Sequence, residues 1–162
     1  MDASLLAFGH WLQNQPFALA IAGSEWAYPI VQATHFTGLS LWIGTTVAVD
    51  LNLLGAGKKA SPPMQFSSSL LLWNWTGFIV AVTGGFLLFS VSAETYLNNA
   101  AFLTKLGLLI PVALVLHVLI QRKAPAWEQA SERLPIAKLA GLAELLLWLG
   151  VATAAVLIPY VG

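Results

Sequence analysis

A nearly continuous apolar stretch from Trp26 to Gly55 constrains the fold of this chain more than any other feature. A helix that crosses a bilayer needs about 20 mostly apolar residues, and this stretch is longer than that. It also contains His35, Trp42 and Asp50, although ionisable side chains are costly inside lipid. Because a helix turns by ~100° per residue, His35 and Asp50 lie only ~60° apart around its axis. One face of this helix is therefore predicted to meet protein or a cofactor rather than lipid.

The composition supports a membrane protein. Of the 162 residues, 58% are hydrophobic and 9% are charged, whereas soluble domains carry about 25% charged residues. Lys plus Arg and Asp plus Glu both number 7, so no basic excess points to nucleic acid. The chain has no cysteine, which excludes disulfides, iron–sulfur clusters, covalently attached haem and thiolate metal sites.

The hydropathy pattern predicts an all-α polytopic membrane protein with a single membrane domain over residues 1–162. Four apolar stretches are long enough to span, at residues 26–55, 66–91, 100–120 and 136–159. Residues 3–14 predict an amphipathic interfacial helix that is too short to cross. Since the connections are short, we expect an antiparallel four-transmembrane-helix bundle. The N-terminal segment lacks the basic residues of a signal peptide, so we interpret it as retained.

Basic residues predict the orientation of the chain in a bacterial inner membrane. They concentrate in the first and third loops and at the start of the fourth span, which indicates the cytoplasmic side. These residues are Lys58, Lys59, Arg122, Lys123, Arg133 and Lys138. Both termini are then expected on the periplasmic side. Lys105, near the outer end of the third span, runs against this rule.

Polar residues inside the predicted spans fall into two layers by depth. The outer layer is expected to hold His35, Glu94 and Lys105, with His10 above it. The inner layer is expected to hold Asp50, Asn74, His117 and Glu144. Ionisable groups within spans usually face the bundle interior or a functional pathway. The two layers therefore identify the candidate site residues.

Haem b is the cofactor that the histidines favour. His35 and His117 are candidate iron ligands, because histidines on facing helices commonly hold haem in a bundle. Other residues are candidates to admit, flank or pair with the macrocycle, namely Gly38, Gly77, Gly84, Trp42, Lys105 and Asp50. The two histidines are expected at depths that differ by roughly 12–15 Å, which favours separate sites. The outer site would then use a non-protein ligand or His10.

Two structural explanations compete with the haem hypothesis. Glycines also permit close helix packing, and each histidine could simply hydrogen-bond within the bundle. Asp50 could pair with Lys58, Lys59 or Lys138 near the helix end. Asp50, Glu144 and His117 are also suited to proton transfer, although the chain shows no inverted repeat of the kind found in many transporters.

The chain resembles a known family over nearly its whole length. The motifs are FGHWLQ, WAYPIVQATHFTGLSLWIGTTVAVDLNLLG, WNWTGFIVAVTGGFLLF, NNAAFLTKLGLLI and LLLWLGVA. They resemble a bacterial family of small four-helix membrane proteins without an assigned activity. That family is loosely similar to membrane b-type cytochromes and to copper-resistance D-type membrane proteins. The chain departs from the family at Ala154-Ala155, where relatives often carry a Gly-Arg pair. The matching positions are His10, Trp11, His35, Asp50, Trp75, Gly77, Gly84, Lys105, His117, Trp148 and Gly150.

The sequence thus predicts a membrane redox subunit that binds haem b, and also quinone, and passes electrons between the quinone pool and a periplasmic partner. We expect it to work inside a larger complex or as a homo-oligomer. One alternative is a cofactor-free structural subunit, whose polar layers fix helix register. Another is a small proton-coupled carrier.

Overall fold

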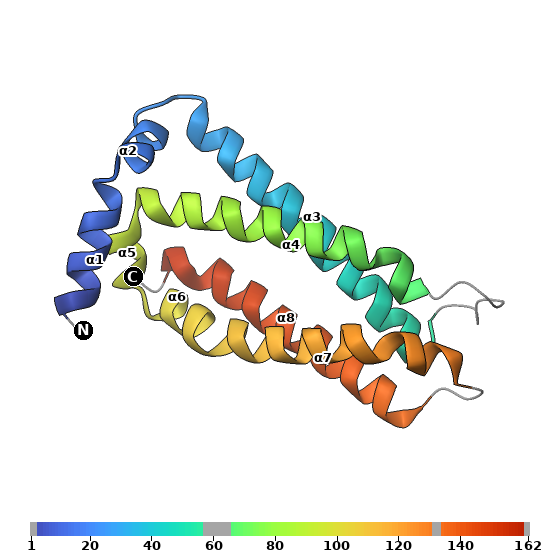
Figure 1. Ribbon diagram of the computed structural model, residues 1–162. Helices are drawn as coiled ribbons and strands as arrows, with labels where there is room; N and C mark the ends of the chain where they lie inside the picture. The colour runs from blue at the N-terminus through green and yellow to red at the C-terminus, as the bar shows by residue number, and fades with distance from the viewer. Residues whose placement is uncertain (1–2, 57–65, 131–133, 161–162) are drawn as a thin grey trace.

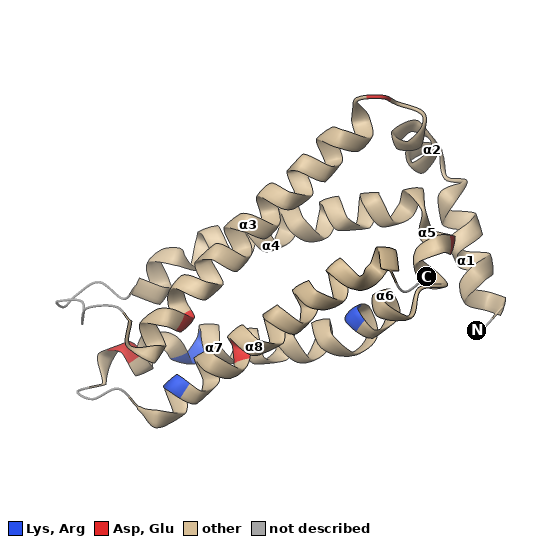
Figure 2. Ribbon diagram, turned by 180° about the vertical axis from the view of Figure 1, so that it is seen from behind, with Lys and Arg blue, Asp and Glu red and all other residues tan. Residues whose placement is uncertain are grey.

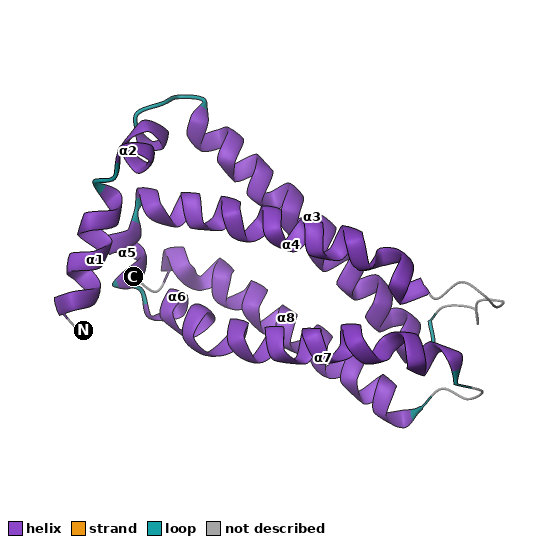
Figure 3. Ribbon diagram, viewed as in Figure 1, coloured by secondary structure: helices purple, strands orange, loops and turns teal. Residues whose placement is uncertain are grey.

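A computed structural model describes residues 3–56, 66–130 and 134–160, and within these ranges the chain is helical with no strand (Figures 1 and 3). Four helices are long and apolar enough to cross a membrane. They are α3 (Ala27–Leu54), α4 (Phe66–Val91), the continuous helix Ala100–Gln129, and α8 (Pro135–Leu157) with its terminal 3-10 turn η2 (Ile158–Tyr160). The sequence places the first two spans within a residue of these limits.

The third long helix differs from the sequence interpretation. It consists of α6 (Ala100–Thr104), a π-helical segment η1 (Lys105–Leu109) and α7 (Ile110–Gln129). Pro111 follows the π segment, and a wider turn suits a residue that has no backbone N–H and whose ring crowds the preceding carbonyl. The helix then continues past Ile120 through Pro125 to Gln129, where the sequence suggested a polar loop.

A side-chain contact accounts for this extension of α7. The Glu128 carboxylate accepts hydrogen bonds from the backbone N–H of Ser67 at 3.1 Å and from its hydroxyl at 3.0 Å. It also accepts one from Asn52 Nδ2 at 3.0 Å. The last turn of α7 therefore binds the first turn of α4 and the last turn of α3.

Glycines set the close packing of α3 against α4. A β-carbon at Gly38 would lie 2.5 Å from the backbone nitrogen of Ala81, and one at Gly77 would lie 2.6 Å from that of Trp42. The two backbones thus approach as closely as small residues permit. Helix α3 ends at Gly55, whose φ of 103° is the left-handed conformation that glycine supplies at a helix terminus.

The other two long helices form a second pair, α7 with α8, which lies beside the α3–α4 pair (Figure 1). His117 of α7 contacts Glu144 of α8, and Ala124 of α7 lies with Ala137 of α8 in a cluster of buried apolar side chains. Both pairs are antiparallel. Helix α3 packs on α8 and α4 on α7, so the four helices enclose one interior.

Three short helices gather at one end of the molecule, where the first and last described residues also lie (Figure 1). They are α1 (Ala3–Gln13), α2 (Pro16–Ala22) and α5 (Ala93–Leu97). Helix α1 packs on α5: a β-carbon on Gly9 would meet the Glu94 backbone at 3.2 Å, and Gln13 Oε1 accepts the Glu94 N–H at 2.6 Å. Burial raises the pKa of the Tyr96 phenol on α5, and the nearby Tyr28 adds to this effect.

The outward faces of the long helices are apolar. Many large aliphatic and aromatic side chains on them are more than half exposed, as expected of helices surrounded by lipid. They include Ile30, Phe36, Leu72, Ile79, Val115, Leu119, Leu139, Leu146 and Leu149. Charged residues sit mainly toward the two ends of the molecule (Figure 2). Of the basic residues used above for orientation, Lys58, Lys59 and Arg133 lie outside the described residues.

Candidate functional site

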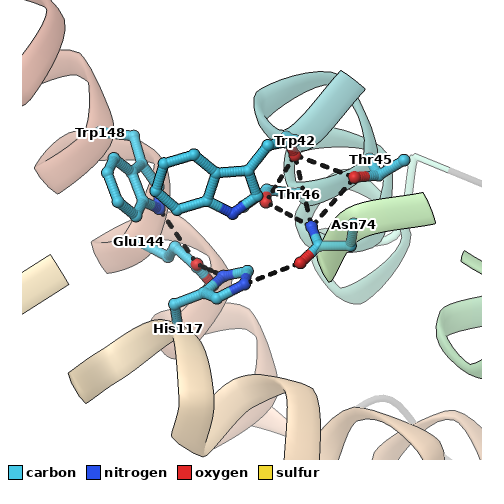
Figure 4. A network of polar contacts seen from close by, with 7 residues as sticks. All are labelled: Trp42, Thr45, Thr46, Asn74, His117, Glu144 and Trp148. Carbon is cyan, nitrogen blue, oxygen red and sulfur yellow. Dashed lines mark hydrogen bonds and ion pairs between the residues drawn. The ribbon is translucent and has the colours of Figure 1, made fainter. Parts of the chain in front are cut away.

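The interior of the four-helix bundle contains a buried hydrogen-bond network centred on His117 (Figure 4). Its side chain is fully buried. Nδ1 lies 2.5 Å from Glu144 Oε1, and Nε2 lies 3.0 Å from Asn74 Oδ1. Trp148 donates its indole N–H to the same Glu144 oxygen at 3.1 Å. Residues of α4, α7 and α8 therefore meet at one point.

Two threonines of α3 fix the orientation of the Asn74 amide. Thr46 donates its hydroxyl hydrogen to the carbonyl of Trp42, and Thr45 donates to the carbonyls of Leu41 and Trp42. Each hydroxyl oxygen is then left to accept a hydrogen bond. Asn74 Nδ2 lies 2.9 Å from both of these oxygens, so the nitrogen side of the amide faces α3.

This orientation determines one proton of His117. Since Asn74 presents its carbonyl oxygen, His117 must carry a proton on Nε2 to donate to it. The other nitrogen faces Glu144, where the short contact holds a single proton on either the imidazole or the carboxyl group. The pair is then either an imidazolium with a carboxylate, or a neutral histidine with a carboxylic acid.

Asp50 adds a second buried carboxyl group to this centre. Its side chain is fully buried and lies near that of Glu144. Gly141, one turn before Glu144 on α8, packs against it, because a β-carbon there would lie only 3.2 Å from the backbone oxygen of Asp50. Neither Asp50 oxygen has a hydrogen-bond partner among the described residues, nor does Glu144 Oε2. The described residues show no lysine paired with Asp50.

Aromatic rings cover this centre. Trp42 and Trp148 pack edge to face with ring centroids 4.6 Å apart, and both are nearly buried. Their rings lie 6.0 and 6.4 Å from the His117 ring. Trp75 lies 5.7 Å from it on another side. These rings surround the imidazole with apolar surface and exclude water from it.

The outer-layer residues do not form one site. His35 donates from Nδ1 to the Ala81 carbonyl at 2.7 Å and packs against α4. Lys105 Nζ lies 5.1 Å from the centre of the Phe102 ring. His10 lies 3.9 Å from Glu94 at the molecular surface. The structure thus brings together the predicted inner layer and leaves the outer layer as separate contacts.

The two histidines lie at different depths. His35 of α3 packs against Gly84 of α4, whereas His117 bonds to Asn74, which faces Thr46 of α3. Thr46 follows His35 by about 11 residues, so the two levels are roughly 16 Å apart along the helix. One iron cannot bind both side chains in this arrangement.

The residues as arranged do not fit haem b. Both ring nitrogens of His117 contact buried side chains, so neither is open to an iron. A β-carbon on Gly84 would meet His35 at 2.8 Å. Backbone atoms of the facing helix occupy the space beside Gly38 and Gly77. These glycines accommodate a helix rather than a macrocycle. Within the described ranges, no group of three or more His, Cys, Asp or Glu side chains could hold a metal ion. Haem b and quinone stay predictions of the sequence.

Several residues of the centre are not identified by sequence reasoning. Thr45 and Thr46 are ordinary residues of an apolar helix, and only the position of Asn74 on the facing helix gives them a role. Gln121 follows His117 by one turn and is nearly buried, which its spacing could have indicated. The sequence predicts a polar loop at Glu128 and therefore no contact of this residue with another helix.

Comparison of the chain with protein-family models, curated proteins and solved structures found no match.

Proposed function

We propose that the protein is a small proton-coupled carrier of the bacterial inner membrane, whose proton-binding group is Asp50, Glu144 and His117. One observation carries the proposal: Glu144 contacts His117 and lies near Asp50, so two carboxyl groups and an imidazole from three different helices are fully buried together inside a bundle of four apolar helices. Such groups are rare within spans and commonly form proton relays.

Electrostatics explains why this group would hold an exchangeable proton. Two carboxylates in contact repel each other strongly where the dielectric constant is low. His117 can neutralise only one of them. A proton on Asp50 or Glu144 removes the remaining charge and also supplies a hydrogen bond to the oxygens that otherwise have no donor.

Glu144 is the central member of the relay. Oε1 contacts the imidazole of His117, and the unpartnered Oε2 belongs to the carboxyl group that lies against Asp50. The proposed path for a proton between His117 and Asp50 therefore runs through the two oxygens of the Glu144 side chain. Asn74 keeps the Nε2 proton in place, so Nδ1 is the nitrogen that exchanges.

The distribution of basic residues supports the proposed orientation. Arg122 and Lys123 lie in the last turns of α7, and Lys138 lies in the first turn of α8. All three are at the end opposite α1 and α5. This end is therefore proposed to face the cytoplasm, with both termini on the periplasmic side. A larger complex with partner subunits, or a homo-oligomer, remains a prediction from the sequence.

A structural subunit is the second candidate. Asn74 and Glu128 each bond to residues of two other helices, which is what fixing helix register requires. Such a role needs no exchangeable proton. Proton transfer therefore distinguishes the two candidates.

Proteoliposomes that enclose a pH-sensitive dye provide the test. A potassium diffusion potential, negative inside, drives protons inward. We expect wild-type protein to acidify the lumen faster than protein-free liposomes do, and Asp50→Asn and Glu144→Gln to abolish the difference. Glu94→Gln, which changes an exposed carboxylate at the outer end, is the matched control and should behave as wild type. Equal acidification with and without wild-type protein would contradict the proposal.

A further inference from the structure

We propose that the Asp50–Glu144 pair is also a binding site for one sodium ion, with the amide oxygen of Gln121 as a third ligand, and that Na⁺ and H⁺ compete for it. This inference rests on the function proposed above, because it names the ion that exchanges with the proton.

The first support is a group of buried oxygens without donors. Both oxygens of Asp50, Oε2 of Glu144 and Oε1 of Gln121 are buried and receive no hydrogen bond from the described residues. Asp50 and Glu144 are at most 1% exposed and Gln121 is 8% exposed. Buried acceptors nearly always receive a hydrogen bond. Four buried oxygens that receive none, inside one bundle, therefore indicate a missing positive partner.

The register of the helices brings Gln121 to the level of Asp50. Because His117 faces Glu144 in an antiparallel pair, Gln121 lies opposite the turn of α8 that contains Gly141. Gly141 is the residue that packs on Asp50. Gln121 also shares a helix face with His117, since the two are one turn apart.

The directions of the side chains make these oxygens converge. Side chains on a helix lean toward its N-terminus. Helices α3 and α7 run in one direction and α8 in the other (Figure 1). Asp50 and Gln121 therefore lean toward the level of Glu144, and Glu144 leans back toward them.

Charge selects a monovalent ion. Because His117 and Glu144 share one proton, this pair is neutral as a whole, and an ionised Asp50 leaves one negative charge, which either one proton or one Na⁺ neutralises. Ca²⁺ usually takes 6–8 oxygen ligands, and Mg²⁺ retains most of its water, so neither suits so few oxygens in a closed interior. Carboxylate and carbonyl oxygens within spans are known ligands of Na⁺.

Binding of ²²Na⁺ to the detergent-purified wild-type protein is the direct test. We expect saturable binding of one ion per chain that a large excess of K⁺ or choline does not remove. One-for-one exchange predicts that the apparent Kd rises about tenfold for each unit of pH lowered in the range where the proton competes. Absence of saturable binding at about pH 8, or binding that does not depend on pH, would overturn the proposal.

Variants locate the ion. We expect Asp50→Asn and Glu144→Gln to abolish binding, and Gln121→Leu to weaken it by at least tenfold. Gln129→Leu is the matched control, because Gln129 is an exposed glutamine on the same helix. Equal binding by the Gln121 and Gln129 variants would remove Gln121 from the site. If liposomes show proton entry but the protein binds no ²²Na⁺, this inference fails while the proton-coupled function stands.

Discussion

Asn74 determines which nitrogen of His117 carries a fixed proton. The amide is held by Thr45 and Thr46, and its oxygen accepts the Nε2 proton of the imidazole. This chain of donors and acceptors leaves Nδ1 for Glu144. A residue with no charge of its own thereby fixes the proton on one nitrogen of His117.

Asn74→Leu should therefore allow the proton of His117 to lie on either ring nitrogen. The substitution keeps a similar volume but leaves the Nε2 proton and two hydroxyl oxygens without partners. We expect a loss of about 1–3 kcal/mol in the free energy of unfolding. The ¹⁵N NMR signals of His117 should show Nε2 protonated in the wild type and a changed pattern in the variant.

Asn98→Leu is the control for this substitution, since Asn98 is exposed at the outer end. It should change stability by no more than about 0.5 kcal/mol and leave the His117 signals unchanged. An unaltered His117 spectrum in Asn74→Leu would show that Asn74 does not fix the tautomer.

At the scale of elements, the α3–α4 contact depends on the absence of side chains at a few positions. A β-carbon at Gly77 would stand 2.6 Å from the backbone nitrogen of Trp42, which cannot move without displacing α3. A β-carbon at Gly44 of α3 would instead meet no atom of another helix within 4 Å among the described residues. The two glycines thus form a matched pair.

Gly77→Ala should destabilise the protein by about 1–3 kcal/mol, because overpacking forces the helices apart. Gly44→Ala should be neutral or stabilising by up to about 1 kcal/mol, because alanine is the better helix former. Unfolding in mixed detergent followed by circular dichroism would measure both. Equal effects at the two positions would contradict the close packing described above.

Hydrogen bonds to Glu128 hold α3, α4 and α7 together at the end of the bundle opposite α1 and α5. Glu128→Ala removes the acceptor of the Ser67 N–H and hydroxyl and of the Asn52 amide. We expect a loss of about 1–3 kcal/mol and faster proteolysis after residue 120, since the last turns of α7 would lose their main tether. Gln129→Ala should leave both properties unchanged. Resistance to protease in the Glu128 variant would argue that apolar contacts alone hold this segment.

The sequence predicts the elements better than their contacts. Hydropathy identifies the four long apolar helices, because length and apolarity are local properties. It misses the helix from Arg122 to Gln129, because the reason for it is a contact with Ser67, which is distant in sequence. The positions of residues along the four predicted spans place Asp50, Asn74, His117 and Glu144 at one depth. The sequence cannot decide whether Asp50 meets a lysine or Glu144, since that depends on how the helices rotate about their axes.

At the scale of the whole molecule, the proposed orientation can be tested by labelling. The chain has no cysteine, so a single introduced cysteine reports one position. In intact cells we expect Asn98→Cys to react with a membrane-impermeant maleimide and Gln129→Cys to react only after permeabilisation. The two positions lie at opposite ends of the bundle. The reverse pattern would place the termini in the cytoplasm.

The central claim is that the interior of the bundle holds an exchangeable proton on the Asp50–Glu144–His117 group. Infrared difference spectra of the purified protein between about pH 5 and about pH 9 would test it most directly, because a protonated buried carboxyl group has its own C=O stretching band. We expect this band in the wild type and in Glu94→Gln, and its loss or displacement in Asp50→Asn and Glu144→Gln. A wild-type spectrum without such a band, or one that neither variant alters, would contradict the account.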